Sequence, residues 1–231
     1  MDEQLNPEVL DSSTLETMRE DWDQRARTNA KHYVQSAKED WDEREFFRSG
    51  EISVANEIMP DMLRICGGSR SPRDLSMIEI GCGVGRMTRF VAQLFGHVTA
   101  VDVSAEMLRR AGETLGDFPN VTLVQSDGAT LASVPDNSQD FAFSFLVFQH
   151  VPTASVVESY CREAYRVLRP GALFKLQVQG AVWERERQPD TWEGVSFSEE
   201  DALRLCSNSG FQWERSDGAN TQSYWLWFKR P

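Results

Sequence analysis

Three closely spaced glycines that follow a short apolar segment constrain the fold of this chain more than any other feature. The apolar segment spans residues 77–80, and Gly81, Gly83 and Gly85 come directly after it. Residues 87–95 then carry one apolar face with helical spacing. Glycines allow a tight turn and let backbone N–H groups approach a ligand closely. The order strand, glycine turn and helix therefore predicts a binding site for a polar ligand at the start of the helix.

Glu79, two residues before the first glycine, bears on the charge of that ligand. A dinucleotide-binding loop reads G-x-G-x-x-G and directs a helix N-terminus at a pyrophosphate. This loop reads G-x-G-x-G, and a carboxylate beside it repels a pyrophosphate but suits a ligand with an ammonium group. A glycine-rich turn without any ligand is the structural alternative, and the strands that follow decide between the two.

Two further acidic residues end predicted strands. Asp102 ends the segment 97–102 and lies 21 residues after the first glycine. An acid about 20 residues after such a loop reaches the ribose hydroxyls of an adenosine ligand. Ser104 provides the N-cap of the next helix, which weakens a purely capping role for Asp102. Asp127 lies at the end of the segment 121–128, which is predicted as a third strand, and a lone acid at such a place is usually a turn former.

The glycine loop and the two acids resemble, in order and spacing, the class I S-adenosylmethionine (SAM) methyltransferases. This resemblance covers residues 77–230 and implies SAM as the cofactor and S-adenosylhomocysteine as the product. It implies that Asp102 holds the ribose, that Asp127 accepts from the adenine amino group and that the next N–H meets a ring nitrogen. Glu79 is expected to serve the methionine end, or else to pair with Arg86 and shape the loop. The predicted cofactor-binding residues are Glu79, Gly81, Cys82, Gly83, Arg86, Asp102, Val103, Met107, Asp127, Gly128 and Phe145.

Residues 22–34 read W-D-x-R-A-x-x-N-A-x-x-Y-V. More loosely, this string resembles the N-terminal lid of small stand-alone bacterial members of the same family that methylate small molecules. Capping-box patterns at Ser13 and Ser36 predict two helix starts. Gly50 is expected to end the second helix, and Pro60 is expected to interrupt a third. The first ten or so residues are expected to fray.

The acceptor is expected beyond the apolar strand 141–146, because ligands bind past the carboxyl ends of parallel strands. The predicted pocket residues are Tyr33, Phe148 and Gln149. His150 is the histidine placed just past a central strand at the ligand end, so it is the candidate catalytic base. The alternative is that His150 only braces the following helix. Phe145 and Phe148 are equally compatible with a place in the core, and the acceptor atom is left open.

Strands alternate with helices from residue 77 to residue 205, which predicts an α/β fold. The expected architecture is a Rossmann-like, seven-stranded, mostly parallel sheet. Segments 211–215 and 224–229 are joined by a short turn and must pair antiparallel as a C-terminal hairpin. Residues 1–72 show no strand pattern and are predicted to form an N-terminal helical lid, packed on a methyltransferase domain at 73–231.

Charge and composition narrow the partners. The formal net charge is −12, and repulsion from phosphate argues against a nucleic-acid partner. The basic cluster at 185–187 is read as a solvated face, and the polar loop 180–197 as a border of the pocket. No apolar run reaches the roughly 18 residues of a membrane span, and the first residues lack the pattern of a signal peptide. The four cysteines are scattered, so neither a disulfide framework nor a metal site is expected. The chain is expected to be cytoplasmic, and its oligomeric state is left open.

Three function classes compete. The favoured class is SAM-dependent methyl transfer to a small molecule through an O-, N- or C-nucleophile. A non-catalytic SAM-binding or interaction protein is the first alternative. A nicotinamide-dependent oxidoreductase is disfavoured by Glu79 and by the spacing of the glycines.

Overall fold

The structure is a computed structural model that describes residues 10–180 and 189–231. The predictions made for the first nine residues and for the basic cluster at 185–187 lie outside these residues. Among the described helices, none is both long enough and apolar enough to cross a membrane.

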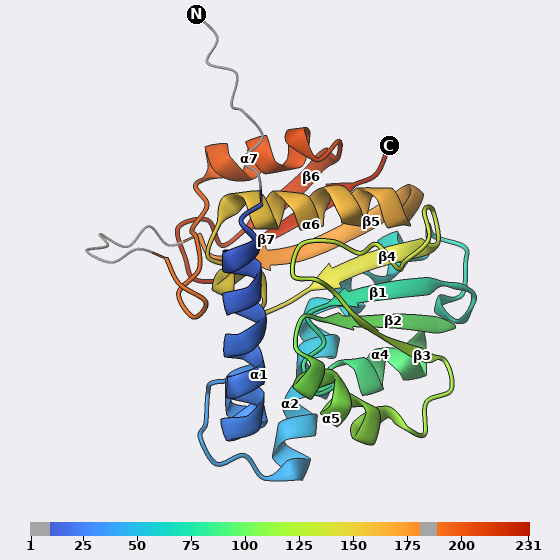
Figure 1. The fold of residues 1–231 in the computed structure, drawn as a ribbon. Helices are drawn as coiled ribbons and strands as arrows, with labels where there is room; N and C mark the ends of the chain where they lie inside the picture. The colour runs from blue at the N-terminus through green and yellow to red at the C-terminus, as the bar shows by residue number, and fades with distance from the viewer. Residues whose placement is uncertain (1–9, 181–188) are drawn as a thin grey trace, which may run out of the picture.

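A seven-stranded sheet in the order β3-β2-β1-β4-β5-β7-β6 runs through the described part of the chain (Figure 1). The strands are β1 (Ser76–Ile80), β2 (His97–Asp102), β3 (Val121–Gln125), β4 (Gln139–Ser144), β5 (Leu168–Val178), β6 (Gln212–Asp217) and β7 (Tyr224–Lys229). The first five strands pair parallel, and β7 pairs antiparallel with both β5 and β6. The predicted α/β fold and the antiparallel C-terminal hairpin are therefore confirmed.

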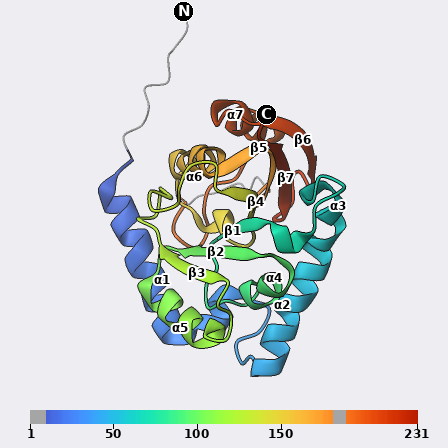
Figure 2. The ribbon, with the colours of Figure 1, turned by 90° about the vertical axis from the view of Figure 1, so that its right-hand side faces the viewer.

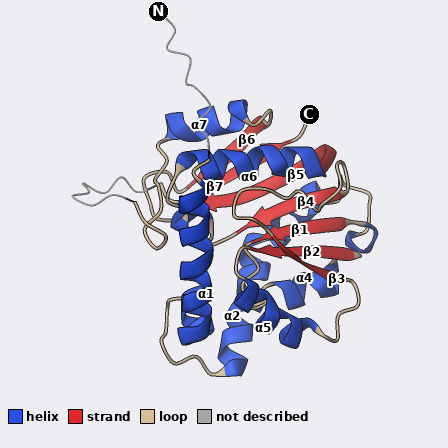
Figure 3. Ribbon diagram, viewed as in Figure 1, coloured by secondary structure: helices blue, strands red, loops and turns tan. Residues whose placement is uncertain are grey.

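Helices cover both faces of this sheet (Figure 3). The elements are α1 (Ser12–Val34), α2 (Glu43–Glu57), η1 (Met59–Asp61), α3 (Met62–Ile65), η2 (Pro72–Asp74), α4 (Thr88–Leu94), α5 (Ala105–Leu115), η3 (Phe148–His150), α6 (Ala154–Val167) and α7 (Glu199–Asn208). Ile78 and Ile80 of β1 face one hydrophobic core together with α6 and α7. Met77 faces a second core with α2, α3 and α4. Because side chains alternate along a strand, Glu79 points to the same side as Met77, toward α4.

The strand β5 begins earlier than the sequence suggests. The turn-forming string R-P-G at residues 169–171 favours a strand that starts after it, but β5 already starts at Leu168, which pairs with Gln139. The register between β4 and β5 then shifts, and Gly171 has a φ of 83°. Such an irregularity accommodates Pro170, which has no N–H to donate to the ladder.

The N-terminal helices correct three predictions. Asp11, not a capping box at Ser13, caps α1 by accepting from the N–H of Ser13. Asp42 caps α2 by accepting from two N–H groups, so the helix start predicted at Ser36 is wrong. The predicted end at Gly50 is also wrong, because α2 runs on to Glu57.

Gly50 has a different role from ending a helix. A Cβ at this position would lie 2.1 Å from the backbone oxygen of Arg86, so the glycine lets α2 pack directly against the loop after β1. The interruption expected at Pro60 is confirmed, since α2 ends and a separate short turn leads into α3.

The helix α1 stands across the carboxyl ends of the strands and contacts α5, and Figure 2 shows the two helices side by side. Its Asp23 accepts from the Oγ of Ser104 and from the N–H of Glu106, which fastens α1 to the first turn of α5. The backbone of Asn29 is not helical, so α1 is kinked before its last turn. This turn carries Tyr33 and Val34 over the loop after β1. A domain division at residue 72 stays a prediction.

Candidate cofactor site

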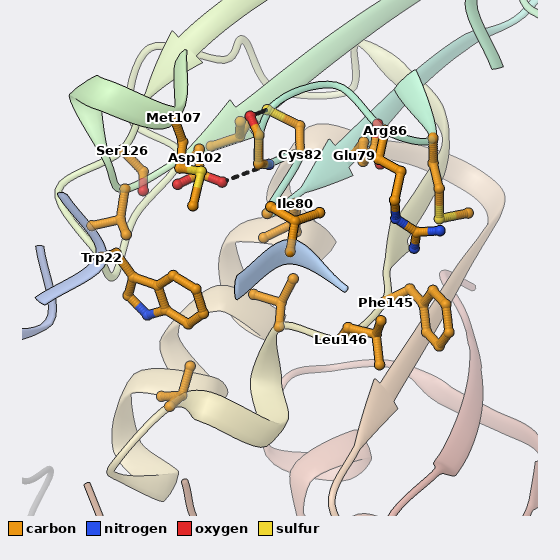
Figure 4. Close-up of a pocket in the computed structure, with 18 of the residues that line it drawn as sticks. Trp22, Glu79, Ile80, Cys82, Arg86, Asp102, Met107, Ser126, Phe145 and Leu146 are labelled. Atoms are coloured by element: carbon orange, nitrogen blue, oxygen red, sulfur yellow. Dashed lines mark hydrogen bonds between the residues drawn. The ribbon is translucent and has the colours of Figure 1, made fainter. Parts of the chain in front are cut away.

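A cavity opens at the carboxyl ends of β1, β2 and β4, under α1 (Figure 4). Its empty volume is about 810 Å³, with the solvent at its mouth included. The structure brings together ten of the predicted site residues in its wall, namely Tyr33, Glu79, Gly81, Cys82, Gly83, Arg86, Asp102, Val103, Met107 and Phe145. Pockets at the strand ends of an α/β sheet are the usual place for a cofactor.

The glycine loop is held closely on both sides. Gly81 has a φ of 81°, and a Cβ there would lie 2.1 Å from the side chain of Val147. Gly83 has a φ of 53°, and a Cβ there would lie 2.6 Å from Val34 of α1. These positions need glycine for backbone conformation and for space. The loop is thus fixed between α1 and the segment after β4, with its backbone exposed to the cavity.

Asp102 connects the end of β2 to this loop. One carboxylate oxygen accepts from the N–H of Gly83 at 2.8 Å, the contact dashed in Figure 4, and the other accepts from the N–H of Ser104 at 2.9 Å. Burial raises the pKa of Asp102 to about 6 in spite of these hydrogen bonds. Each oxygen keeps a further lone pair, so the carboxylate can still accept hydrogen bonds from a ligand in the cavity.

Glu79 lies buried at the other end of the loop, with 5% of its surface exposed. Its carboxylate accepts from the hydroxyl of Thr88 at 2.7 Å. Burial raises the pKa of Glu79 to about 7, although the Thr88 hydrogen bond and the charge of Arg86 act to lower it. These two charged side chains form no direct ion pair, since Arg86 is turned to other partners. The alternative in which Glu79 pairs with Arg86 therefore has no contact to support it.

Arg86 is a buried cation with spare donors. It is 3% exposed, and one terminal nitrogen donates to the hydroxyls of Ser49 and Ser53 on α2 at 3.3 and 3.0 Å. Its Nε has no hydrogen-bond partner within the described part of the chain. Burial lowers the pKa of Arg86 to about 10, so the group stays charged near neutral pH. A buried guanidinium held only by neutral hydroxyls can bind an anionic ligand group.

Aromatic residues of α1 close the cavity from above. Trp22 and Tyr33 line it, and both rings contact Trp192, with ring centres 6.4 and 5.5 Å apart. Arg25 donates to the backbone oxygen and the hydroxyl of Thr191, both at 2.9 Å, and lies over the Trp22 ring. The helix α1 and the segment around residue 191 are therefore joined by polar and aromatic contacts.

His150 lies behind this aromatic layer and does not line the cavity. Its ring stacks on Trp192 at 4.7 Å and meets Trp22 edge-on at 5.4 Å. Nδ1 donates to the backbone oxygen of Trp192, because a carbonyl can only accept. The Gln149 amide then donates to the lone pair of Nε2, at 3.0 Å. Burial lowers the pKa of His150 to about 4, and its role as a base stays a prediction.

Four other predicted site residues also lie outside the cavity wall. The exposed carboxylate of Asp127 accepts from the N–H groups of Ala129 and Thr130, as a turn former does. Gly128 donates its N–H to the Ser126 hydroxyl at 3.3 Å. Phe148 is fully buried in the core beside Tyr160, and Gln149 accepts from Gln177 at 2.9 Å. Cofactor or substrate roles for these four residues stay predictions.

Several residues of the cavity wall are not among the residues predicted from the sequence. They are Met18, Trp22, Val34, Ile80, Met87, Val101, Ser126, Leu146, Val147, Val151 and Tyr160. Most belong to apolar stripes, where the pattern alone cannot separate a cavity wall from a packed core. Leu146 has a φ of 59°, which is rare for a residue other than glycine and often accompanies a functional site.

Comparison with known proteins agrees with this site. Residues 78–176 match the family model described as a methyltransferase domain. Over 124 residues, 53% of this chain and 37% of the relative, the chain is 29% identical to 2-methyl-6-phytyl-1,4-hydroquinone methyltransferase from Synechocystis sp.. It is 28% identical to malonyl-[acyl-carrier protein] O-methyltransferase from Salmonella typhimurium, covering 67% of this chain and 59% of the relative. The chain thus spans less than two thirds of the length of either relative.

Among solved structures, the DhpI–SAM–HEP complex aligns with a TM-score of 0.66 at 18% sequence identity, covering 96% of this chain and all of the other. This likeness concerns the fold. The matched residues 78–176 therefore carry a class I SAM-dependent methyltransferase domain. The resemblance to the small bacterial type stays a prediction.

Proposed function

We propose that this protein transfers the methyl group of SAM to a small-molecule acceptor. The observation that carries the proposal is the order of charged groups along the cavity. Asp102 lies at one end, and Glu79 and Arg86 lie at the other, with the exposed loop backbone between them (Figure 4). An adenosine ligand with an amino-acid tail presents ribose hydroxyls, an ammonium and a carboxylate in a matching order.

The residues of the wall fit this ligand group by group. The free lone pairs of Asp102 suit the ribose hydroxyls, and the buried Glu79 carboxylate suits the ammonium. The unpartnered Nε of Arg86 suits the carboxylate, which would satisfy a buried donor that otherwise costs stability. A pyrophosphate in place of the tail would meet Glu79, which disfavours a nicotinamide cofactor.

When bound, SAM supplies an activated methyl group and a neutral leaving group. The task of the protein is to hold the acceptor in line with the bond that breaks, which contributes up to ~7–11 kcal/mol in well-oriented systems. Trp22, Tyr33 and Phe145 each contribute an aromatic ring to the wall, and such rings can orient an acceptor and exclude water. We therefore propose an acceptor with an apolar or aromatic body.

The setting of the reaction follows from composition. The net charge of −12 favours a small molecule over a nucleic acid as acceptor. All four cysteines are buried and free, which is compatible with the proposed cytoplasmic location.

Isothermal titration calorimetry with SAM, S-adenosylhomocysteine and NADH tests the cofactor. We expect the first two to bind and NADH not to bind. Incubation with methyl-labelled SAM and a panel of phenols, quinols, amines and thiols then tests transfer. Binding of NADH alone would contradict the proposal. SAM binding without labelled product from the panel or from a metabolite extract would favour a non-catalytic SAM-binding protein.

A further inference from the structure

We propose that the hydroxyl pair of Ser126 and Tyr160 recognises the adenine ring of the cofactor through a single hydrogen bond to a ring nitrogen. This inference rests on the proposed function. Ser126 follows β3 and Tyr160 belongs to α6, and both line the cavity. They are 7% and 5% exposed, and their oxygens lie 2.8 Å apart.

The two hydroxyls together have one hydrogen that is free for donation to a ligand. Two hydroxyls carry two hydrogens, and one of them lies between the two oxygens whichever residue donates. The Ser126 oxygen also accepts from the N–H of Gly128. The second hydroxyl hydrogen therefore has no acceptor among the described residues. A buried donor without an acceptor is costly, and the cavity is the side on which a ligand can supply one. Burial also raises the pKa of Tyr160, so its hydroxyl keeps its hydrogen near neutral pH.

The position of the pair identifies the part of the ligand that it meets. Ser126 lies beside Asp102 and Met107 in Figure 4, at the end of the cavity away from Arg86 and Phe145. With the ribose on Asp102 and the amino-acid tail near Arg86, the base must lie on the Ser126 side. The ring nitrogens of adenine accept hydrogen bonds and its amino group donates, so the single free donor matches a ring nitrogen.

The neighbouring groups leave this task to the hydroxyls. The Gly128 N–H is directed at Ser126, and the Asp127 carboxylate accepts from Ala129 and Thr130 outside the cavity wall. Val103 and Met107 supply apolar contact to the faces of a flat ring but no hydrogen bonds to its edge.

The experiment is a set of affinities for S-adenosylhomocysteine and its 1-deaza, 3-deaza and 7-deaza analogues, measured by calorimetry. The variant is Tyr160→Phe, which keeps the ring packed against Phe148. Tyr165→Phe is the matched control, because that residue lies on the same helix but outside the cavity wall. We expect Tyr160→Phe to weaken the natural ligand about 3- to 10-fold. One of the three deaza analogues should bind the wild type about 3- to 10-fold more weakly than S-adenosylhomocysteine does. Tyr160→Phe should not weaken the binding of that analogue further.

Three results would overturn the inference. The first is unchanged affinity for the natural ligand in both Tyr160→Phe and Ser126→Ala, because either hydroxyl of the pair can hold the free hydrogen. The second is that Tyr160→Phe weakens the binding of all three analogues equally, which would mean that Tyr160 has a purely structural role. The third needs no variant: the wild type would bind every deaza analogue as tightly as the natural ligand. If the wild type binds none of these ligands, the proposed function itself fails, and this outcome is distinct from the other three.

Discussion

The carboxylate of Asp102 accepts a hydrogen bond of 2.8 Å from the N–H of Gly83, and this contact joins the ends of β2 and the loop after β1. One side chain therefore both shapes the glycine loop and faces the ligand cavity. A substitution at Asp102 affects both the shape of the loop and the binding of the ligand. A second variant is therefore needed to separate the two effects.

The first prediction concerns this carboxylate. Asp102→Ala should weaken SAM about ten- to a hundred-fold, because a charged acceptor for the ribose hydroxyls is lost. Asp102→Asn keeps one oxygen that can accept from Gly83 while losing the charge, and should show an intermediate loss. Calorimetry measures both values, and thermal melts show whether the loop remains folded. Unchanged SAM affinity in the alanine variant would remove Asp102 from the site.

The second prediction is a pH dependence set by Glu79. The pKa of Glu79 is raised to about 7, so in the free protein the carboxyl loses its proton as the pH rises through 7. An ammonium ligand binds the ionised form more tightly, so SAM affinity should rise between pH 6 and pH 8, with proton release on binding. Glu79→Gln should bind more weakly and lack this rise. A rise of equal size in that variant would assign the titration to another group.

The raised pKa of Glu79 also makes the stability of the protein depend on pH, in the direction opposite to its effect on SAM affinity. Between the unfolded pKa, about 4.5, and the folded value of about 7, the native protein binds more protons than the unfolded chain. Stability should therefore fall as the pH rises through this window. Urea denaturation at several pH values measures the free energy of unfolding of the wild type and of Glu79→Gln. The part of the fall with pH that Glu79 causes should be absent in the variant.

The third prediction concerns Arg86. Arg86→Gln should weaken S-adenosylhomocysteine about ten- to a hundred-fold, because the carboxylate of the ligand loses a charged partner. Methylthioadenosine, which lacks the amino-acid tail, should bind wild type and variant alike. Ser53→Ala removes one hydroxyl that holds the guanidinium and should cause a smaller loss for the first ligand only. An equal loss for both ligands would mean that Arg86 acts through the fold of the loop.

The sequence predicted the sheet well, because most strands carry an apolar run bounded by turn residues, and the more polar β6 is indicated by the short turn that joins it to β7. The bounds of β2 and β7 were predicted without error. The false helix start at Ser36 shows the limit of capping patterns, because Asp42 lies close by and provides the stronger acceptor for two N–H groups. Charged residues of the site were predictable from the loop and strand ends. Met18 and Tyr160 were not, since only tertiary packing decides which apolar positions of a helix face a cavity.

The fourth prediction concerns α1. Its aromatic residues line the cavity, and Arg25 fastens it to Thr191, so a ligand below should order it further. SAM should slow hydrogen exchange between residues 22 and 47. The helix α7 contributes nothing to the cavity wall and serves as the internal control. Equal exchange with and without SAM, at saturating ligand, would speak against a role as a lid.

The last prediction decides between the two roles of His150. A general base contributes about 10²- to 10⁴-fold to a rate and must reach the acceptor with a free lone pair. In the structure, Nδ1 donates to Trp192, Nε2 accepts from Gln149, and burial lowers the pKa to about 4. This geometry supports a structural role, but one in which the ring holds Trp192 against Trp22 of α1 rather than bracing the following helix. We therefore expect His150→Asn, which can still donate to the Trp192 carbonyl, to keep turnover within about 10-fold of the wild type, and His150→Ala to lose more. Between pH 5 and pH 8, the turnover of the wild type and that of the asparagine variant should also depend on pH in the same way. Loss of about 100-fold or more in both variants, together with such a titration, would instead establish His150 as the base.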